Sequence, residues 1–168
     1  MDAIVCADAQ WGIGRENRLL FRISEDLRRF RRLTLGKTLL MGRNTFLSLP
    51  NGKPLPDRKH IVLSTTLPPQ DGVLCVSTLA EALQEAGEEA FVIGGAQVYA
   101  ALLPYCAHAY VTRVQERREA DCFFPDLDAS PDWRLAVQGE WREEAGLRFR
   151  YTDYEALHPL PIPREDAL

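Results

Sequence analysis

Short apolar runs separated by polar and glycine-containing stretches dominate the first two-thirds of the chain. Six of these runs have the length and composition of buried strands, and they cover residues 3–7, 38–42, 59–64, 73–76, 91–93 and 107–114. Between several of them, apolar residues recur at helical spacing over residues 24–33, 78–86 and 96–103. Beyond residue 130 apolar and polar positions alternate, which predicts an antiparallel pair at 133–141 and 147–157 around a turn at 143–146.

Strands that alternate with short helices, followed by strands alone, predict an α/β fold. We expect a three-layer sandwich, with a mostly parallel central sheet, an antiparallel C-terminal strand, and helices on both faces. Ligands of such sheets bind at the carboxyl ends of the strands. The expected domain covers residues 1–157, and the tail at 158–168, with its three prolines, is expected to be loose.

Two junctions join a predicted strand through glycine to a predicted helix. In the first, Gly94-Gly95 follows the strand at 91–93, so a ligand can approach the backbone without meeting a Cβ atom. Free amides at a helix start favour an anion. Because the full G-x-G-x-x-G pattern is absent, this stretch alone fits a phosphate site and an ordinary turn equally well. The second junction is Gly42-Arg43, ahead of a short helix at 45–49, and it is another candidate anion site.

Asp26 is out of place in the first predicted helix, which Ser24 is expected to cap. It lies four residues before Phe30, so it borders the apolar side of the helix and not the side with four arginines, which we expect to be solvated. A carboxylate in this place is either a first-turn partner of the helix dipole or a buried functional acid. The segment 8–22 before it has no period and contains Gly12 and Gly14, which is typical of a lid or binding loop.

Composition and charge narrow the functional classes. The chain has 168 residues, enough for one domain, and a net charge of −4, which argues against nucleic acid as a partner. We expect no secretory signal and no membrane span. The four cysteines and three histidines are scattered without ligand spacing, which indicates reduced thiols, a cytoplasmic location and no metal.

Six motifs, in the right order over residues 4–154, resemble those of the dihydrofolate reductase family of the bacterial single-domain type. They resemble its mobile loop, acid-bearing helix, cofactor motif, substrate-tail loop, pyrophosphate turn and late loop, at residues 12–17, 24–30, 41–46, 54–58, 93–99 and 121–126. The resemblance implies reduction of 7,8-dihydrofolate to 5,6,7,8-tetrahydrofolate by NADPH, with hydride transfer to C6 and protonation at N5. It also implies antifolate inhibitors as ligands, and we expect a monomer.

The resemblance implies that Asp26 binds the pterin edge and favours the N5-protonated substrate, with Thr112 holding its carboxylate. The loop around Leu19 would admit the water that brings the proton, and Phe21 stands where the family usually has tryptophan. Arg58 would bind the α-carboxylate of the glutamate tail, a role that suits its fork geometry. The remaining substrate contacts implied are Ile4, Val5, Cys6, Leu27, Phe30, Leu49, Leu55 and Ile93.

The same resemblance implies a cofactor site along the strand ends. Gly94, Gly95 and Thr45 would hold the pyrophosphate, and Arg43, Ser64 and Thr65 would meet the adenosine 2′-phosphate. The remaining cofactor contacts implied are Ala7, Ile13, Gly14, Asn17, Gly42, Asn44, Leu63, Ile93, Ala96, Gln97, Val98 and Tyr99.

Three departures from the family pattern qualify these expectations. Leu19-Leu20-Phe21 replaces the usual Leu-Pro-Trp, so an indole donor is missing and the backbone at Leu20 is freer. Gln97 stands where some members place a second cofactor arginine, and the loop before Arg58 is slightly longer than in short members. Two other functions stay open: a related pyrimidine reductase of riboflavin biosynthesis, and a nucleotide-binding domain without catalysis.

Overall fold

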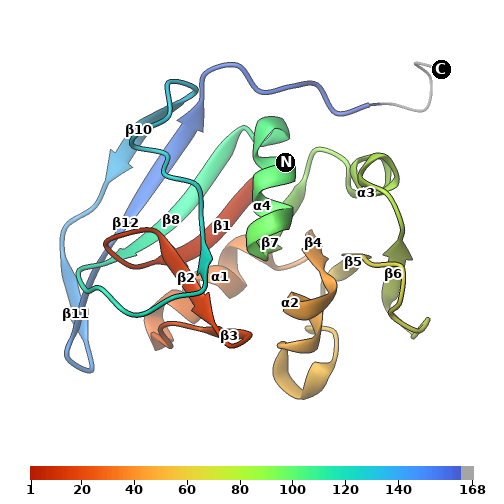
Figure 1. Cartoon of the computed structure of the whole chain (residues 1–168), viewed down its shortest axis with the longest axis horizontal. Coiled ribbons are helices and arrows are strands. Elements are labelled where there is room, and N and C mark those ends of the chain that lie inside the picture. Colours follow the sequence, from red (N-terminus) through yellow and green to blue (C-terminus); the bar gives the residue numbers. More distant parts are fainter. Residues whose placement is uncertain (164–168) are drawn as a thin grey trace.

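The computed structural model describes residues 1–163 and has one large sheet with helices on both sides (Figure 1). Its nine strands follow the spatial order β10-β12-β8-β1-β7-β4-β5-β6, with β11 paired to β12. The strands are β1 (Asp2–Ala7), β4 (Thr38–Gly42), β5 (Lys59–Leu63), β6 (Val73–Val76), β7 (Ala90–Gly94), β8 (His108–Val114), β10 (Trp133–Gln138), β11 (Arg142–Glu144) and β12 (Leu147–Ala156). The helices are α1 (Ser24–Thr34), α2 (Arg43–Leu47), α3 (Leu79–Ala86) and α4 (Ala96–Leu102).

The pairing confirms the mostly parallel sheet with an antiparallel C-terminal strand. Strands β8, β1, β7, β4, β5 and β6 are parallel to their neighbours along this row. Strand β12 runs antiparallel to β8 and to β10, and the β11–β12 hairpin turns at residues 145–146. The alternating pattern beyond residue 130 therefore predicted the pairing, although the last strands are broken by a bulge and a bend.

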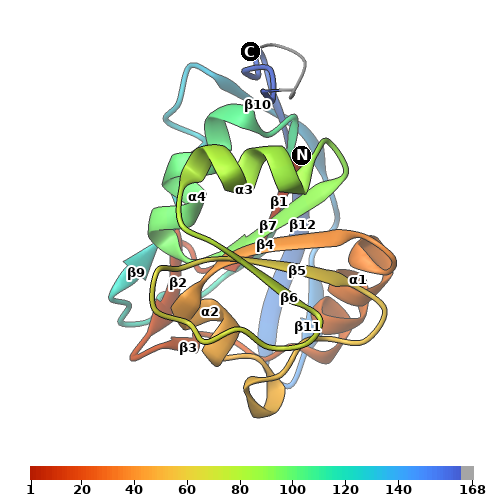
Figure 2. The same ribbon diagram turned by 90° about the vertical axis from the view of Figure 1, so that its right-hand side faces the viewer.

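Two apolar clusters, one on each face of the sheet, make the three layers (Figures 1 and 2). Leu40 of β4 packs with residues of α3 and α4 in one cluster, whereas Leu39 and Met41 pack with Phe30 of α1 and Phe46 of α2 in the other. Successive residues of β4 thus enter opposite clusters and all are fully buried, as expected for a strand covered on both faces.

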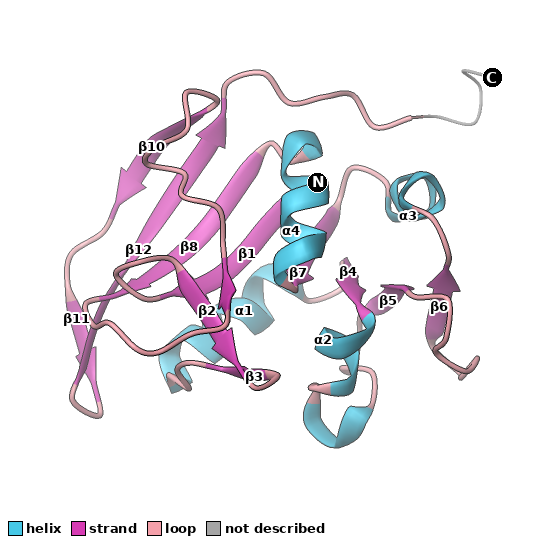
Figure 3. Ribbon diagram, in the orientation of Figure 1, coloured by secondary structure: helices cyan, strands magenta, loops and turns pink. Residues whose placement is uncertain are grey.

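The segment 8–22, expected to lack regular structure, contains a small hairpin. Strands β2 (Gly12–Arg15) and β3 (Arg18–Leu19) pair around a two-residue turn, and β9 (Cys122–Phe123) adds a third strand (Figure 3). Glu16 and Asn17 in the turn both have positive φ, at 50° and 61°, which is the geometry that a tight hairpin requires.

Two further expectations about chain ends are corrected. Helix α1 begins at Ser24, but Ile23 is its N-cap and has no side-chain capping bond, so Ser24 is not the cap. The expected tail at 158–168 lies outside the described residues from 164 on. Of its described part, Leu160 donates its amide to Pro104 O at 2.8 Å and Ile162 packs against the core, so this portion is not loose.

Candidate active site

The carboxyl ends of five neighbouring strands meet at one edge of the sheet. Because β8, β1, β7, β4 and β5 are parallel and adjacent, residues near their ends lie side by side. Met41 is registered with Gly94, and Gly42 with Leu63. The structure therefore brings both predicted glycine junctions and the end of β5 to the same edge.

Strands β1 and β7 separate near this edge. Their register covers only Asp2 with Phe91 and Ala3 with Val92, whereas β1 pairs with β8 along its whole length to Ala7. Beyond Ala3 the side of β1 that faces β7 is thus free of strand pairing. Buried Tyr99 of α4 reaches into this gap and donates its hydroxyl to Ile4 O at 2.6 Å. The carbonyl has a second lone pair, so Ile4 can accept a further hydrogen bond from a ligand in the gap.

Asp26 and Thr112 form a hydrogen-bonded pair between α1 and β8. The Thr112 hydroxyl, on a residue only 2% exposed, donates to Asp26 Oδ1 at 2.5 Å. Burial raises the pKa of Asp26, while the bond from Thr112 and the positive charge of Arg29 oppose the rise. Burial also raises the pKa of the Cys6 thiol, which lies in register with Thr112 and beside Asp26. The site therefore combines a carboxylate poised for protonation with a fixed orientation.

Most of the predicted substrate wall belongs to one apolar cluster. Ile4 is buried in it, and Phe30, Leu49, Leu55 and Ile93 are partly buried against it. These residues come from β1, α1, the loop after α2 and β7, so the structure gathers them in one cluster on the face of the sheet that α1 covers.

Three predicted wall residues lie elsewhere, and one of them, Cys6, is partly buried against the cluster that contains Phe21. Val5 packs against the α4-side cluster, because its side chain points to the opposite face of the sheet from Ile4. Only its backbone faces the same edge. Leu27 is 39% exposed and belongs to none of the buried clusters of residues 1–163.

Arg58 is anchored but keeps its charge unpaired. Its Nε donates to Thr34 Oγ1 and its Nη1 to Pro56 O, each at 3.0 Å. No ion pair involves it among residues 1–163, and partial burial, with Arg31 nearby, lowers its pKa. A fixed guanidinium without a counter-charge is suited to binding a carboxylate.

The two glycine junctions face each other closely. A Cβ atom on Gly94, whose φ is +130°, would lie 3.2 Å from Thr45 Oγ1, and one on Gly42 would lie 3.2 Å from Val98 Cγ2. The peptide bond Gly94-Gly95 is cis. Backbone and the Thr45 hydroxyl therefore approach each other closely between the β4 and β7 junctions, where side chains larger than glycine would collide. Ala96, Gln97 and Val98 begin α4 directly after Gly95.

Polar side chains also lie beside the two glycine junctions, at the ends of β4 and β5. Arg43 and Asn44 are exposed at the start of α2, and Arg43 makes no ion pair within residues 1–163. Ser64 follows Leu63, and its Oγ accepts the amides of Thr66 and Leu67, which turns the chain and leaves Thr65 exposed. The three residues predicted to bind the 2′-phosphate, Arg43, Ser64 and Thr65, thus follow the ends of two adjacent strands.

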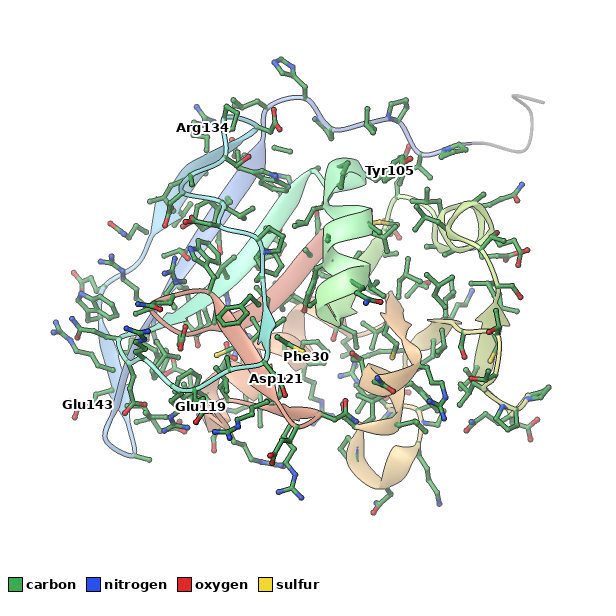
Figure 4. The ribbon with its side chains drawn as sticks, viewed as in Figure 1. Phe30, Tyr105, Glu119, Asp121, Arg134 and Glu143 are labelled. Atoms are coloured by element: carbon green, nitrogen blue, oxygen red, sulfur yellow. The ribbon has the colours of Figure 1, made fainter. Side chains whose placement is uncertain are left out.

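The hairpin β2–β3 is tied to the loop before β9, where Figure 4 shows Asp121 and Glu119. Asp121 accepts the Glu16 amide at 2.8 Å and donates its own amide to Gly14 O at 3.0 Å. Leu19, at the end of β3, is 69% exposed. The segment predicted as a lid or binding loop therefore has a defined shape, and Trp11 and Ile13 bury their side chains in the core cluster, while its role stays a prediction.

Phe21 lies in a buried cluster at the inner end of this segment. It is 5% exposed and packs with Ile23, Val114 and Phe149, with Cys6 partly buried against them. The guanidinium of Arg118 lies 4.3 Å from its ring centroid. The structure thus links Phe21 to the site through Cys6, and its catalytic role stays a prediction.

Two supporting residues, Glu144 and Arg29, escaped the sequence analysis. Glu144 of β11 accepts the amides of Ser24 and Glu25 at 2.6 and 3.1 Å, and so caps α1 from another part of the chain. Arg29, expected on a solvated face, pairs with Asp153 at 3.0 Å and has a side chain only 13% exposed. Only a prediction of how β11 and β12 pack against α1 could have revealed these contacts.

Among residues 1–163, no group of three or more His, Cys, Asp or Glu side chains could hold a metal ion. In the same part of the chain, none of the helices has the length and apolar character needed to cross a membrane. All four cysteines are free thiols.

The chain matches the family model described as "Dihydrofolate reductase" over residues 1–156. It is 39% identical over 158 residues to a dihydrofolate reductase of Bacillus subtilis (strain 168), covering 90% of this chain and 92% of that protein. It is 41% identical over 161 residues to a dihydrofolate reductase of Mycobacterium tuberculosis (strain ATCC 25618 / H37Rv), covering 92% of this chain and 97% of that protein. It is 38% identical over 176 residues to the dihydrofolate reductase type 9 of Escherichia coli, covering 98% of this chain and 97% of that protein. The family match spans every residue of the site described above.

Proposed function

The chain belongs to the dihydrofolate reductase family and reduces 7,8-dihydrofolate to 5,6,7,8-tetrahydrofolate, and from this we propose that its cofactor is NADPH and that Asp26 is its catalytic carboxylate. The observation that carries the proposal is the pair of Asp26 and Thr112 at the edge where β1 and β7 separate. This pair supports the proposal because a nearly buried hydroxyl fixes the orientation of the carboxylate.

A nicotinamide cofactor, when bound, supplies the hydride. The Gly42 and Gly94 junctions support a pyrophosphate site, because both are glycines at strand ends, the Thr45 hydroxyl lies beside Gly94 and Gly95, and helix α4 begins directly after them. Arg43 supports the choice of NADPH over NADH, since it is an exposed cation without an ion pair within residues 1–163. Ser64 and Thr65 at the neighbouring strand end add hydroxyl donors for the 2′-phosphate.

The substrate lies with its pterin ring against Asp26 and its tail toward Arg58. Asp26 accepts hydrogen bonds from the pterin N3 and 2-amino group, a charge-assisted pair. The apolar cluster of Ile4, Phe30 and Leu49 covers the ring and excludes water from it. Arg58 binds the α-carboxylate of the glutamate tail with the guanidinium nitrogens that its internal bonds leave free.

Protonation at N5 is favoured by the charge of Asp26, which makes N5 easier to protonate before hydride arrives at C6. The proton itself enters with water along the exposed Leu19 loop. Because Phe21 has no N–H donor, any water ordered near the pterin ring must be held by other groups. The Thr112 hydroxyl is already committed to Asp26, so it orients the carboxylate and does not deliver the proton.

We further propose that the protein acts as a monomer in the cytoplasm and binds antifolates in the same cleft. Four free thiols are typical of a reducing compartment. Both predicted subsites are complete within one chain, so a second copy is not needed to build them. Neither nucleic acid nor a membrane surface is proposed as a partner, given the net charge of −4.

The deciding experiment is NADPH oxidation by the purified chain with dihydrofolate, with and without an antifolate. We expect turnover that depends on dihydrofolate and is abolished by the antifolate. Turnover with a ribosylaminopyrimidine in place of dihydrofolate would instead support the related riboflavin-pathway reductase. Cofactor binding without turnover of either substrate would support a binding domain, and both results would refute the proposal.

A further inference from the structure

His60 lies directly behind the loop that carries Arg58. It is the second residue of β5 and only 2% exposed. Its Nε2 atom lies 3.0 Å from the amide nitrogen of Leu55, and its Nδ1 atom lies 3.2 Å from the carbonyl oxygen of Arg58. One imidazole ring therefore bridges the two ends of the loop 55–58.

The two partners define the form of the ring. A backbone amide can only donate, so Nε2 of His60 must be the unprotonated acceptor for Leu55. A carbonyl oxygen can only accept, so Nδ1 must carry the hydrogen that is donated to Arg58 O. Burial lowers the pKa of His60, which agrees with a neutral ring in this place. The ring is thus a neutral brace with both of its polar atoms in use.

The braced loop carries two parts of the proposed substrate site. Leu55 is partly buried against the apolar cluster assigned above to the pterin ring, and Arg58 directs its guanidinium to Thr34 and Pro56 O. Asp57 between them has a φ of +61°, and its carbonyl accepts the Gly36 amide at 2.9 Å. The outer side of the loop is therefore held by the α1–β4 turn, while the inner side depends on His60.

We propose that His60 is a positioning residue for the tail subsite, which holds the loop 55–58 so that Arg58 presents its guanidinium to the substrate carboxylate. The proposal rests on the assignment of Arg58 to the glutamate tail made above. It deepens that assignment, because it makes tail recognition depend on a side chain that does not touch the substrate.

The test compares two substrates, dihydrofolate and a dihydropterin that lacks the benzoylglutamate tail. His60→Leu keeps an apolar side chain of similar size but removes both hydrogen bonds. We expect it to raise KM for dihydrofolate about 10-fold, the effect of losing bonds of ordinary strength, with kcat retained. KM for the tail-less substrate should rise by less than about 3-fold, since that substrate never reaches Arg58 and meets the loop only through Leu55.

His60→Asn is the matched control. Its amide nitrogen can occupy the place of Nδ1 and donate to Arg58 O, so we expect KM for dihydrofolate to stay within about 3-fold of the wild-type value. Arg58→Ala should raise KM for dihydrofolate alone, and adding His60→Leu to it should bring less than about 2-fold more, because the braced group is then absent. Activity on the tail-less substrate also reports that each variant is folded.

The outcomes separate the two proposals. If Arg58→Ala discriminates between the substrates but His60→Leu affects both equally or neither, the brace is refuted and the tail assignment stands. If Arg58→Ala does not discriminate, the tail assignment itself fails, and the role inferred for His60 falls with it.

Discussion

Asp26→Asn is the substitution that tests the chemistry of the site most directly. The change removes a charge but keeps the shape, and the amide oxygen can still accept the bond from Thr112. At neutral pH we expect turnover to fall by about 10²–10⁴-fold, the usual range for an acid–base contribution. NADPH affinity should stay nearly unchanged, because the proposed pyrophosphate site is formed by the glycine junctions after β4 and β7, whereas Asp26 lies on α1.

The same substitution should stabilise the protein at neutral pH. Burial is the largest cause that raises the pKa of Asp26, so the folded state holds this proton more tightly than the unfolded state does. The stability linked to that proton is fully present below the unfolded value near 3.8 and is lost as pH rises through the folded pKa. At pH values above the folded pKa of Asp26, a rise of one in that pKa lowers the free energy of unfolding of the wild-type protein by about 1.4 kcal/mol. The asparagine variant does not carry this cost.

The assay is urea unfolding and steady-state turnover of both proteins between pH 5 and pH 8. The asparagine variant should be the more stable one at pH 8, and its advantage should shrink toward pH 5. Its deficit in turnover should also shrink as pH falls, since solvent then supplies the proton. Glu25→Gln is the control, because it removes the neighbouring carboxylate of α1, which pairs with Arg142, without touching Thr112.

Three results would refute this reasoning. Wild-type turnover at pH 7 would return Asp26 to the role of a first-turn helix acid. A deficit that stays constant to pH 5 would leave it as a binding residue without a part in protonation. The third result is a difference in stability, variant minus wild type, that falls between pH 5 and pH 8. It would mean that the folded protein favours the charged form of Asp26.

Other substitutions test the supports of the site. Thr112→Val should cost about 1.5–3 kcal/mol in unfolding free energy, as loss of a donor to a charged group, and should raise the pKa of Asp26 further in the pH–rate profile; Thr112→Ser should restore both. Glu144→Gln should lower the urea midpoint by an amount equivalent to about 1 kcal/mol, because the α1 amides lose a charged cap, and an unchanged midpoint would contradict that role. Arg43→Ala should raise KM for NADPH much more than KM for NADH, whereas an equal loss would place the 2′-phosphate elsewhere. Phe21→Trp should lower the melting temperature, since a larger ring in a packed cluster costs about 1–3 kcal/mol, and a retained melting temperature would show spare room beside Phe21.

Local patterns predicted the elements whose signals are local. The strands at 38–42 and 73–76 match β4 and β6 residue for residue, because each is a short apolar run that ends at a polar or glycine residue. The helix predicted over 78–86 is observed from Leu79 to Ala86, and Thr78 is its cap, with its hydroxyl accepting the Glu81 amide at 3.2 Å. Asp26 stood out in the sequence for a physical reason, since a carboxylate beside an apolar stripe requires either solvent or a partner.

Contacts between distant segments account for what the sequence could not reveal. The hairpin of β2 and β3 contains glycine and charged residues, so it has no strand-like pattern, and Asp121 and β9 supply much of its hydrogen bonding. Arg29 was assigned to solvent by helical spacing, yet its guanidinium lies 4.1 Å from the ring centroid of Tyr151. In both cases the stabilising partner lies on an element whose position only the sheet order determines.

Contacts from another loop hold the segment in which the expected proline is replaced by Leu20. Without proline, the backbone at Leu20 is not restricted by its own chemistry. Instead Arg118 donates to Leu20 O and covers the ring of Phe21, while Asp8 accepts the Arg118 amide at 2.9 Å. The inner end of this segment is therefore fixed by a cation from the loop before β9, and its outer end by Asp121 of the same loop. Because one loop holds both ends, substitutions in it should alter how water reaches the substrate before they alter substrate affinity.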